Sequence, residues 1–194
     1  MYESDETLYE RFLREKDNEA LDVLVERYST GLTLFLRGFV GSMEDAEDLM
    51  MDSFVAIATK RSWSARGSSF KTWLFAIGRK LALMHLRKSK KIRHYGDGFD
   101  AEPEDTGVYT DDAAQHPEIQ FLKKEQNLKL YRAMEKLQPQ YKEVLFLLYF
   151  EQMSYEEVEK VMGKSKKQLY RLCDHGKAAL RSELERMGFD YDLY

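Results

Sequence analysis

Cysteine, proline and long apolar runs are scarce in this sequence. The single cysteine, Cys173, excludes an internal disulfide framework and any zinc site that needs several cysteines. Only three prolines occur in 194 residues, and Leu, Glu, Lys, Arg and Ala are abundant, which predicts an all-α protein with little or no sheet. No apolar run approaches the roughly 20 residues of a membrane span, and the N-terminus lacks a basic-then-apolar signal pattern. We therefore expect a cytoplasmic protein without direct membrane insertion.

The sequence also lacks an arrangement of side chains that suggests catalysis. The four histidines have no metal-ligand spacing, and no pair of carboxylates suggests a two-metal site. We expect no enzymatic activity, no metal, no cofactor and no small-molecule substrate. Cys173 lies on an apolar stripe, which favours a small core residue over a redox sensor.

The charges of the chain are strongly segregated. The formal net charge is −4, but residues 96–118 contain eight acids and no Lys or Arg, so the rest of the chain is positive. Residues 79–93 contain seven Lys or Arg and no acid. Local patches decide whether phosphate is attracted, so a nucleic-acid partner is compatible with the negative total. The acidic stretch also lacks periodicity and predicts a flexible linker over 95–117, between small helical domains at 1–94 and 118–194.

Helical periodicity predicts four helices in the N-terminal domain, beginning near residues 3, 18, 43 and 70, with Gly31 as a possible kink in the second. The third has an apolar stripe and an opposite face with five acids, Glu44, Asp45, Glu47, Asp48 and Asp52. Acids in a first turn favour the helix dipole, so half of this pattern has a structural explanation. The acidic run continues beyond that turn.

A polar loop over 60–69 precedes the fourth helix, which continues into the basic segment. Aromatic residues interleaved with cations are typical of proteins that hold unpaired bases, because rings stack and cations contact the backbone. The alternative is that Phe70, Trp73 and Leu74 are ordinary core residues. That alternative is at least as good for Trp73, whereas Trp63, in the polar loop, is harder to explain as core.

The C-terminal domain has the pattern of a helix-turn-helix over 154–184. Ser154 with Glu157, and Ser165 with Gln168, are two helix-start signatures, and Gly163 lies between them. An apolar stripe runs along the second helix, with cations at the N-terminal end of its opposite face, as suits a helix that enters a major groove. Capped helix pairs also occur in proteins that never bind DNA, so this segment alone leaves both interpretations open.

With these patterns in their order along the chain, the sequence resembles the extracytoplasmic-function (ECF) sigma factors, the small two-domain initiation subunits of bacterial RNA polymerase. In the N-terminal half the matching segments are DNEALDVLVERY at 17–28, EDAEDLMMDSFVAI at 44–57 and GSSFKTWLFAIGRKLALMHLRK at 67–88. In the C-terminal half they are LQPQYKEVLFLLYFEQMSYEEVEKVMGKS at 137–165 and HGKAALRSEL at 175–184. Each is a short amphipathic pattern, and it is their joint order that carries the resemblance.

The resemblance implies a division of labour. The third helix would bind core RNA polymerase through Asp45, Glu47, Asp48, Met51, Asp52 and Phe54. The loop and fourth helix would capture flipped bases of the −10 element through Ser62, Trp63, Phe70, Lys71, Trp73 and Lys80. Promoter phosphates would be held by Arg79, Arg87, Lys88, Lys90 and Lys91. The −35 element would be read in the major groove by Lys166, Lys167, Gln168, Tyr170 and Arg171. The family also implies an anti-sigma factor as a further partner, beside core polymerase and promoter DNA.

Several positions depart from the family pattern. Met51 and Asp52 stand where glutamine and glutamate are common, Lys80 and Met84 where asparagine and aspartate are common, and 175–177 reads His-Gly-Lys for Arg-Ala-Arg. Family preferences for the −10 sequence are therefore not transferred to this chain. Glycine inside a helix costs up to about 1 kcal/mol against alanine, so we expect Gly176 to pack closely against a neighbour.

Two other functions remain to be weighed. A helix-turn-helix regulator that acts without polymerase would explain the C-terminal domain, but not the acidic third helix or the aromatic loop. A DNA-processing enzyme such as a recombinase or nuclease would need a metal site or catalytic group that the sequence does not offer.

Overall fold

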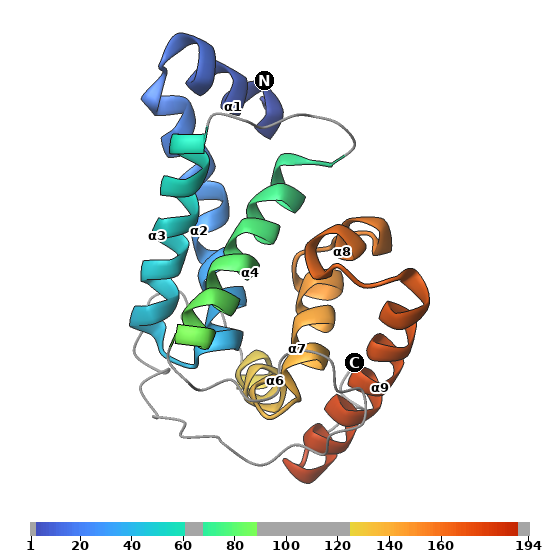
Figure 1. Cartoon of the computed structure of the whole chain (residues 1–194). Helices are drawn as coiled ribbons and strands as arrows, with labels where there is room; N and C mark the ends of the chain where they lie inside the picture. The colour runs from blue at the N-terminus through green and yellow to red at the C-terminus, as the bar shows by residue number, and fades with distance from the viewer. Residues whose placement is uncertain (1–2, 61–67, 89–124, 190–194) are drawn as a thin grey trace.

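The computed structural model describes residues 3–60, 68–88 and 125–189. All regular secondary structure in these ranges is helical, which confirms the expected all-α fold. Figure 1 shows two groups of helices side by side. The N-terminal group consists of α1 (Asp5–Glu15), α2 (Asn18–Val40), α3 (Met43–Lys60) and α4 (Phe70–Lys88). The C-terminal group consists of α6 (Glu125–Glu135), α7 (Pro139–Leu145), a π-helix (Phe146–Phe150), α8 (Tyr155–Met162) and α9 (Lys166–Arg186).

The N-terminal helices begin close to the expected residues. Ser4 caps α1 by accepting a hydrogen bond from the Thr7 amide, and Asp17, one residue earlier than expected, caps α2 through the Ala20 amide. Gly41 ends α2 with φ +77°, a left-handed conformation that favours glycine. Helix α2 runs through Gly31 without a break.

The C-terminal group contains one feature that the periodicity did not predict. Helix α7 begins at Pro139, and the helix changes to π geometry at Phe146. The π turn closes with hydrogen bonds from the Glu151 amide to the Phe146 carbonyl (3.0 Å) and from the Met153 amide to the Leu147 carbonyl (2.9 Å). Gln152 follows with φ +52°, which is uncommon outside glycine. The π-helix therefore ends at Phe150, and Glu151 follows as its C-terminal cap.

The two groups of helices pack against each other through one continuous hydrophobic core. Helix α4 contacts α2 and α3 on its own side and α8 across the boundary, while α7 contacts α2 (Figure 1). Phe35 of α2 lies 5.3 Å from Phe75 and 5.8 Å from Phe146, measured between ring centroids. The predicted linker at 95–117 lies outside the described residues, so the domain limits at 1–94 and 118–194 stay predictions.

Gly176 confirms an expectation about packing. A Cβ at this position would lie 3.2 Å from Leu145 Cδ1 and 3.2 Å from Tyr141 Cβ. The close approach of α7 to α9 therefore accounts for a glycine inside a helix. Cys173 is buried, as its place on the apolar stripe predicted.

Candidate polymerase and nucleic-acid interfaces

The outer face of α3 combines acids with exposed apolar side chains. Met51 and Val55 are each 55% exposed, and the exposed acids Glu44, Asp48 and Asp52 flank them at helical spacing. Asp45 and Glu47 are half-buried. Charged side chains around an apolar centre are typical of a protein-binding surface, in which the apolar part gives affinity and the rim gives register.

One residue that was predicted for this face is buried instead, and one exposed residue was not predicted. Phe54 is only 4% exposed and belongs to the core, so it supports α3 from beneath. Val55, the next residue, takes the exposed position. The 3.6-residue period could have separated the two, because Phe54 continues the stripe of Met50 and Ile57 that packs on the core, whereas Val55 lies four residues after the exposed Met51.

The aromatic residues at the start of α4 form a buried cluster. Phe70 is fully buried, and its ring centroid lies 5.3 Å from Tyr9 and 6.1 Å from Trp73. Tyr9 donates a hydrogen bond to the Ile57 carbonyl at 2.8 Å, and burial raises its pKa to about 12. Trp73 is half-buried and 5.4 Å from Tyr9. In this conformation Phe70 fixes the base of α4 and offers no ring face to a nucleic-acid base.

The predicted cations of α4 fall into two groups. Lys80, Arg87 and Lys88 are exposed, whereas the side chains of Lys71 and Arg79 are only 26% and 17% exposed. Lys71 Nζ lies 2.8 Å from Glu151 Oε2, and Arg79 Nε donates to Glu143 Oε1. Both carboxylates belong to the C-terminal helices. The remaining predicted positions, Ser62, Trp63, Lys90 and Lys91, lie outside the described residues.

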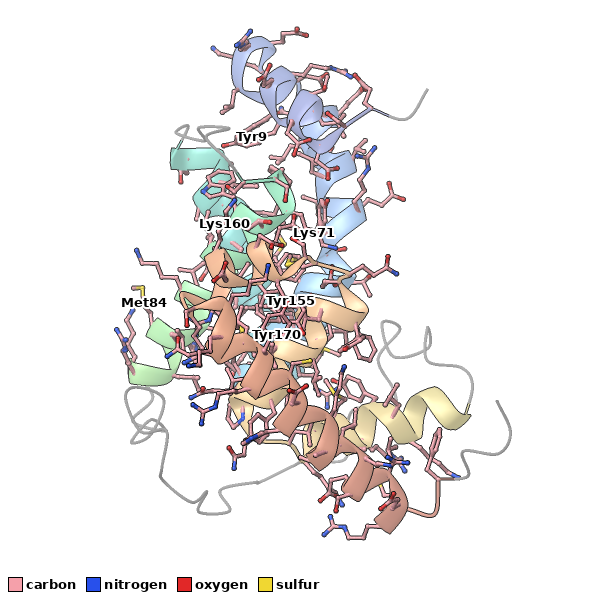
Figure 2. The ribbon with its side chains drawn as sticks, turned by 90° about the vertical axis from the view of Figure 1, so that its right-hand side faces the viewer. Tyr9, Lys71, Met84, Tyr155, Lys160 and Tyr170 are labelled. Carbon is pink, nitrogen blue, oxygen red and sulfur yellow. The ribbon has the colours of Figure 1, made fainter. Side chains whose placement is uncertain are left out.

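A groove between α4 and α8 gathers the exposed cations of both helices. Its lining is Ala76, Arg79, Lys80, Leu83, Met84, Arg87, Lys160 and Val161. Figure 2 places Met84 and Lys160 on the same side of the molecule. This mixture of apolar and basic side chains suits an anionic ligand that also has apolar surface, such as a nucleic-acid strand or an acidic peptide.

The helix-turn-helix has the predicted geometry. At Ser154 the Oγ accepts from the Glu157 amide (3.3 Å) while Glu157 Oε2 accepts from the Ser154 amide (3.0 Å). Gly163 ends α8 with φ +67°, and Gln168 Oε1 accepts hydrogen bonds from both the amide (2.9 Å) and the hydroxyl (3.1 Å) of Ser165. The sequence therefore located both helices and the turn between them correctly.

The predicted −35 residues are all exposed at the N-terminal end of α9, but some have intramolecular partners. Lys166 Nζ lies 2.5 Å from Glu156 Oε1, which raises the pKa of Lys166 and lowers that of Glu156. Tyr170 stacks on Tyr155 with ring centroids 4.3 Å apart (Figure 2). Gln168 accepts at the cap, as described above. Lys167 and Arg171 extend the same exposed surface.

A tyrosine cluster beneath α9 was not predicted. Tyr149 Oη lies 3.8 Å from Cys173 Sγ, and Lys177 Nζ lies 5.1 Å from the centroid of the Tyr149 ring. Burial, followed by a hydrogen bond with Cys173, raises the pKa of Tyr155 well above its usual value. These contacts fix the orientation of α9 on the π-helix and α8. Only the distances in the folded chain bring these residues together, since they are spread over 149–177.

Two searches of the described residues concern other kinds of site. No group of three or more His, Cys, Asp or Glu in the described ranges is arranged to hold a metal ion. No helix that the structure describes is long and apolar enough to cross a bilayer.

Comparison with known families matches both halves of the chain. Residues 24–92 match the sigma-70 region 2 family and residues 127–180 match sigma-70, region 4. The chain is 30% identical over 165 residues to the RNA polymerase sigma-H factor of Pseudomonas aeruginosa, covering 82% of this chain and 83% of that protein. It is 30% identical over 162 residues to the ECF RNA polymerase sigma-E factor of Haemophilus influenzae, covering 82% and 84%.

Solved structures share the fold. The complex of CnrH with the cytosolic domain of CnrY contains a chain that matches with a TM-score of 0.66 at 21% identity, over 95% of this chain and 99% of that one. The sigma factor RpoE of Bartonella quintana, solved with the anti-sigma factor NepR, matches with a TM-score of 0.57 over 84% and 97%.

The match to region 2 disfavours a helix-turn-helix regulator that acts without polymerase, because such a regulator would need only the C-terminal half. With both regions present in order and relatives matched over most of their length, the chain belongs to the ECF sigma factors, which bind core RNA polymerase and direct promoter-specific transcription initiation.

Proposed function

We propose that this sigma factor divides its work among three surfaces. The outer face of α3 binds core polymerase through Met51, Val55, Asp48 and Asp52, with Asp45 and Glu47 at its edge and Phe54 as its internal support. The observation that supports this is the pair of exposed apolar side chains in an acidic surround. Exposed apolar side chains on a stable helix are expected where another protein covers them.

The α4 surface binds the melted −10 strand. Lys71, Arg79 and Lys80 lie along one helix and would contact the backbone of an unpaired strand, with Arg87, Lys88, Lys90 and Lys91 holding phosphates further along. Ser62 and Trp63, in the loop before α4, would receive the flipped base, and Phe70 and Trp73 would hold the loop in position. Favourable binding of the flipped base offsets the few kcal/mol that unstacking costs.

The exposed end of α9 reads the −35 element. Phosphate contacts give salt-dependent affinity and base contacts give sequence choice. Arg171 and Lys167 would reach base edges, Tyr170 presents an edge fixed by its stack on Tyr155, and Lys166 and Gln168 would contact the backbone.

An anti-sigma factor regulates this chain, and the groove between α4 and α8 is its proposed contact. The sigma factor RpoE of Bartonella quintana was solved in complex with the anti-sigma factor NepR, and CnrH in complex with the cytosolic domain of CnrY. The basic and apolar side chains that line the groove in this chain would suit an acidic, amphipathic segment. The sigma factor itself performs no covalent chemistry, and it acts where core polymerase acts, in the cytoplasm.

The test of the function is transcription from a library of genome fragments by core polymerase, with and without the purified protein. We expect discrete new start sites that depend on the protein, with two shared upstream elements. New start sites that survive a Met51→Lys substitution and an Arg171→Ala substitution unchanged would contradict the assignment of the surfaces. Stable binding to core polymerase without any new start site would contradict the function itself.

A further inference from the structure

Helix α1 contacts both of the helix ends that flank the loop before α4. Tyr9 Oη donates a hydrogen bond to the carbonyl of Ile57, in the last turn of α3, at 2.8 Å. Glu6 Oε1 accepts a hydrogen bond from the amide of Phe70, the first residue of α4, at 3.0 Å. Tyr9 follows Glu6 by three residues, so both side chains lie on one side of α1. Figure 1 shows α1 at the end of the N-terminal group where α3 ends and α4 begins.

Helix α1 is itself held in place by α2. Asp5 Oδ1 lies 2.6 Å from Arg27 Nη1, and Asp5 Oδ2 accepts a hydrogen bond from Tyr28 Oη. The same Arg27 nitrogen donates to the Glu3 carbonyl at 3.0 Å. An 11-residue helix is marginally stable by itself in water, so contacts with the rest of the fold decide where α1 lies. The two acids of its first turn therefore have separate roles, since Asp5 binds α2 and Glu6 binds α4.

The first amides of α4 need acceptors, because no preceding turn of the helix supplies them. Ser69 Oγ accepts from the Thr72 amide at 3.3 Å, and Glu6 accepts from the Phe70 amide. A carboxylate suits this end of a helix, where the dipole is positive. Glu157 of α8 contacts the same turn through the hydroxyls of Ser69 and Thr72, at 2.8 and 3.1 Å. Glu6 instead holds the backbone, so it fixes the position at which α4 begins.

The ring of Tyr9 contacts both aromatic residues that were predicted for the −10 surface. Its centroid lies 5.3 Å from that of Phe70 and 5.4 Å from that of Trp73. Tyr9 is fully buried, and its hydroxyl is bonded to α3. Because the hydroxyl is fixed on α3 while the ring packs on α4, this one side chain couples the two helices.

Burial of α1 does not by itself require these two hydrogen bonds. Leu8 and the ring of Tyr9 already give the helix an apolar face. Hydrogen bonds add direction, because donor and acceptor must be aligned. A binding site needs its side chains held to within about 0.5 Å, and a further layer of directional contacts provides this. The two positions that are proposed to receive the flipped base lie, in sequence, between the two ends that α1 holds.

From these observations we propose that Glu6 and Tyr9 are positioning residues for recognition of the −10 element. They fix the end of α3 and the first turn of α4 relative to each other, so α1 influences which −10 sequence is accepted without contacting DNA. When either hydrogen bond is lost, the first turn of α4 shifts, and binding of the preferred sequence weakens more than binding of its variants. The inference rests on the −10 role proposed above for the loop and α4.

The test measures opening of promoter DNA by the holoenzyme, which is core polymerase with the full-length chain. The promoter comes from the start-site experiment above, and a fluorescent adenine analogue in the −10 element reports its opening. Each variant is measured on the native element and on a panel in which single −10 base pairs are replaced. The ratio of the two opening rates is the −10 discrimination. Affinity for core polymerase and the thermal unfolding midpoint are measured on the same variants.

Glu6→Ala removes the acceptor of the Phe70 amide, whereas Glu6→Gln keeps a neutral acceptor. We expect Glu6→Ala to lower the −10 discrimination on the order of tenfold, and Glu6→Gln to keep most of it. Tyr9→Phe removes only the hydroxyl and should lower the discrimination about threefold. Affinity for core polymerase should stay unchanged, because the exposed face of α3 is intact. The control, Glu10→Ala, removes an exposed acid from the same helix and should change none of these values.

A double substitution, Lys80→Ala and Arg87→Ala, tests the −10 role itself, because both residues are exposed on α4. If it slows opening while Glu6→Ala and Tyr9→Phe keep full discrimination, the inference is wrong and the −10 role stands. A loss that is equal on every −10 sequence and follows the unfolding midpoint would show a purely structural role and also reject the inference. Tyr9→Phe decides the matter where Glu6→Ala does not fold. If the double substitution leaves opening unchanged, the −10 role fails, and the inference fails with it.

Discussion

The cations of α4 and those of α9 are assigned similar tasks but have different surroundings. On α4 the side chains of Lys71 and Arg79 are 26% and 17% exposed and pair with acids of the other helix group. On α9 the Lys166 side chain is 46% exposed and its partner, Glu156, belongs to the same group. A contact within one group leaves the surface accessible, whereas a contact between groups hides it.

The comparison shows that the two surfaces differ in how far they depend on the arrangement of the whole molecule. The proposed −35 surface is complete once α8 and α9 have folded together. On the proposed −10 surface, Lys71 and Arg79 are covered by acids of the other helix group.

The largest predicted effect is that of Arg37→Ala on the contact between the two helix groups. The change leaves Glu135 and Tyr131 without their cation in a buried contact, which is expected to lower the free energy of unfolding by about 3–5 kcal/mol. Urea denaturation of the full chain measures it. Arg181→Ala is the matched control, because its pair with Glu185 is exposed and worth less than about 1 kcal/mol. Equal losses in the two variants would contradict a buried interdomain contact.

A substitution on the α3 surface should weaken binding to core polymerase without destabilising the fold. Met51→Lys places a cation at the centre of the exposed face and should weaken binding to core polymerase by about 2–4 kcal/mol, with an unchanged unfolding midpoint. Phe54→Ala should do the reverse and mainly destabilise the fold, because that ring is 4% exposed. Affinity for core polymerase and thermal unfolding, measured on both variants, separate the two roles.

The exposed end of α9 gives a sharper prediction for DNA. Arg171→Ala should weaken binding to the −35 duplex by about 1–3 kcal/mol if the guanidinium contacts a base, with little loss on a scrambled duplex. Lys166→Ala should have a smaller effect that is similar on both duplexes, because Glu156 already holds that ammonium group. Equal loss for Arg171→Ala on both duplexes would indicate a phosphate contact instead.

The smallest predicted effect is a pH dependence of the stability of the contact between the two helix groups. Burial lowers the pKa of Lys142 from 10.5 to about 8; Glu135 opposes this shift and Arg37 adds to it. When the groups separate, Lys142 returns to water and takes up a proton between about pH 8 and 10.5. The contact therefore becomes more stable as pH rises through that window.

The distance between fluorophores on cysteines introduced at the exposed positions Asp22 and Ala178 measures this effect, because Cys173 is buried. We expect the contact to strengthen by about 1 kcal/mol between about pH 7.5 and pH 9 in the wild type, and not in Lys142→Met. A wild type in which the contact weakens over the same range would contradict the assignment to Lys142.

The sequence was sufficient for the local structure and the family. Helix starts at Ser4, Ser154 and Pro139, helix ends at Gly41 and Gly163, and the apolar stripe of α9 all follow from neighbouring residues, whose influence is short-range. The resemblance of the ordered segments to ECF sigma factors rests on the same local patterns. The close packing at Gly176 was predicted because a helical glycine needs a nearby neighbour.

Other features needed the folded chain. The exposure of Val55 in place of Phe54 depends on how α3 is rotated about its axis against the core. The full burial of Phe70 depends on Tyr9 and Tyr28, which are far away in sequence. The π-helix at Phe146 was not predictable from periodicity, because its apolar residues would suit an α-helix equally well.

By itself, then, the sequence determined the helices, the two matched regions and the family, since propensity, capping and periodicity act over a few residues. Only the tertiary structure decided that Lys71 faces Glu151 and that Arg79 faces Glu143, because these partners are 80 and 64 residues apart. A cation in a sequence does not specify which anion it meets. That choice depends on the packing of the two helix groups, which brings residues that are distant in sequence into contact.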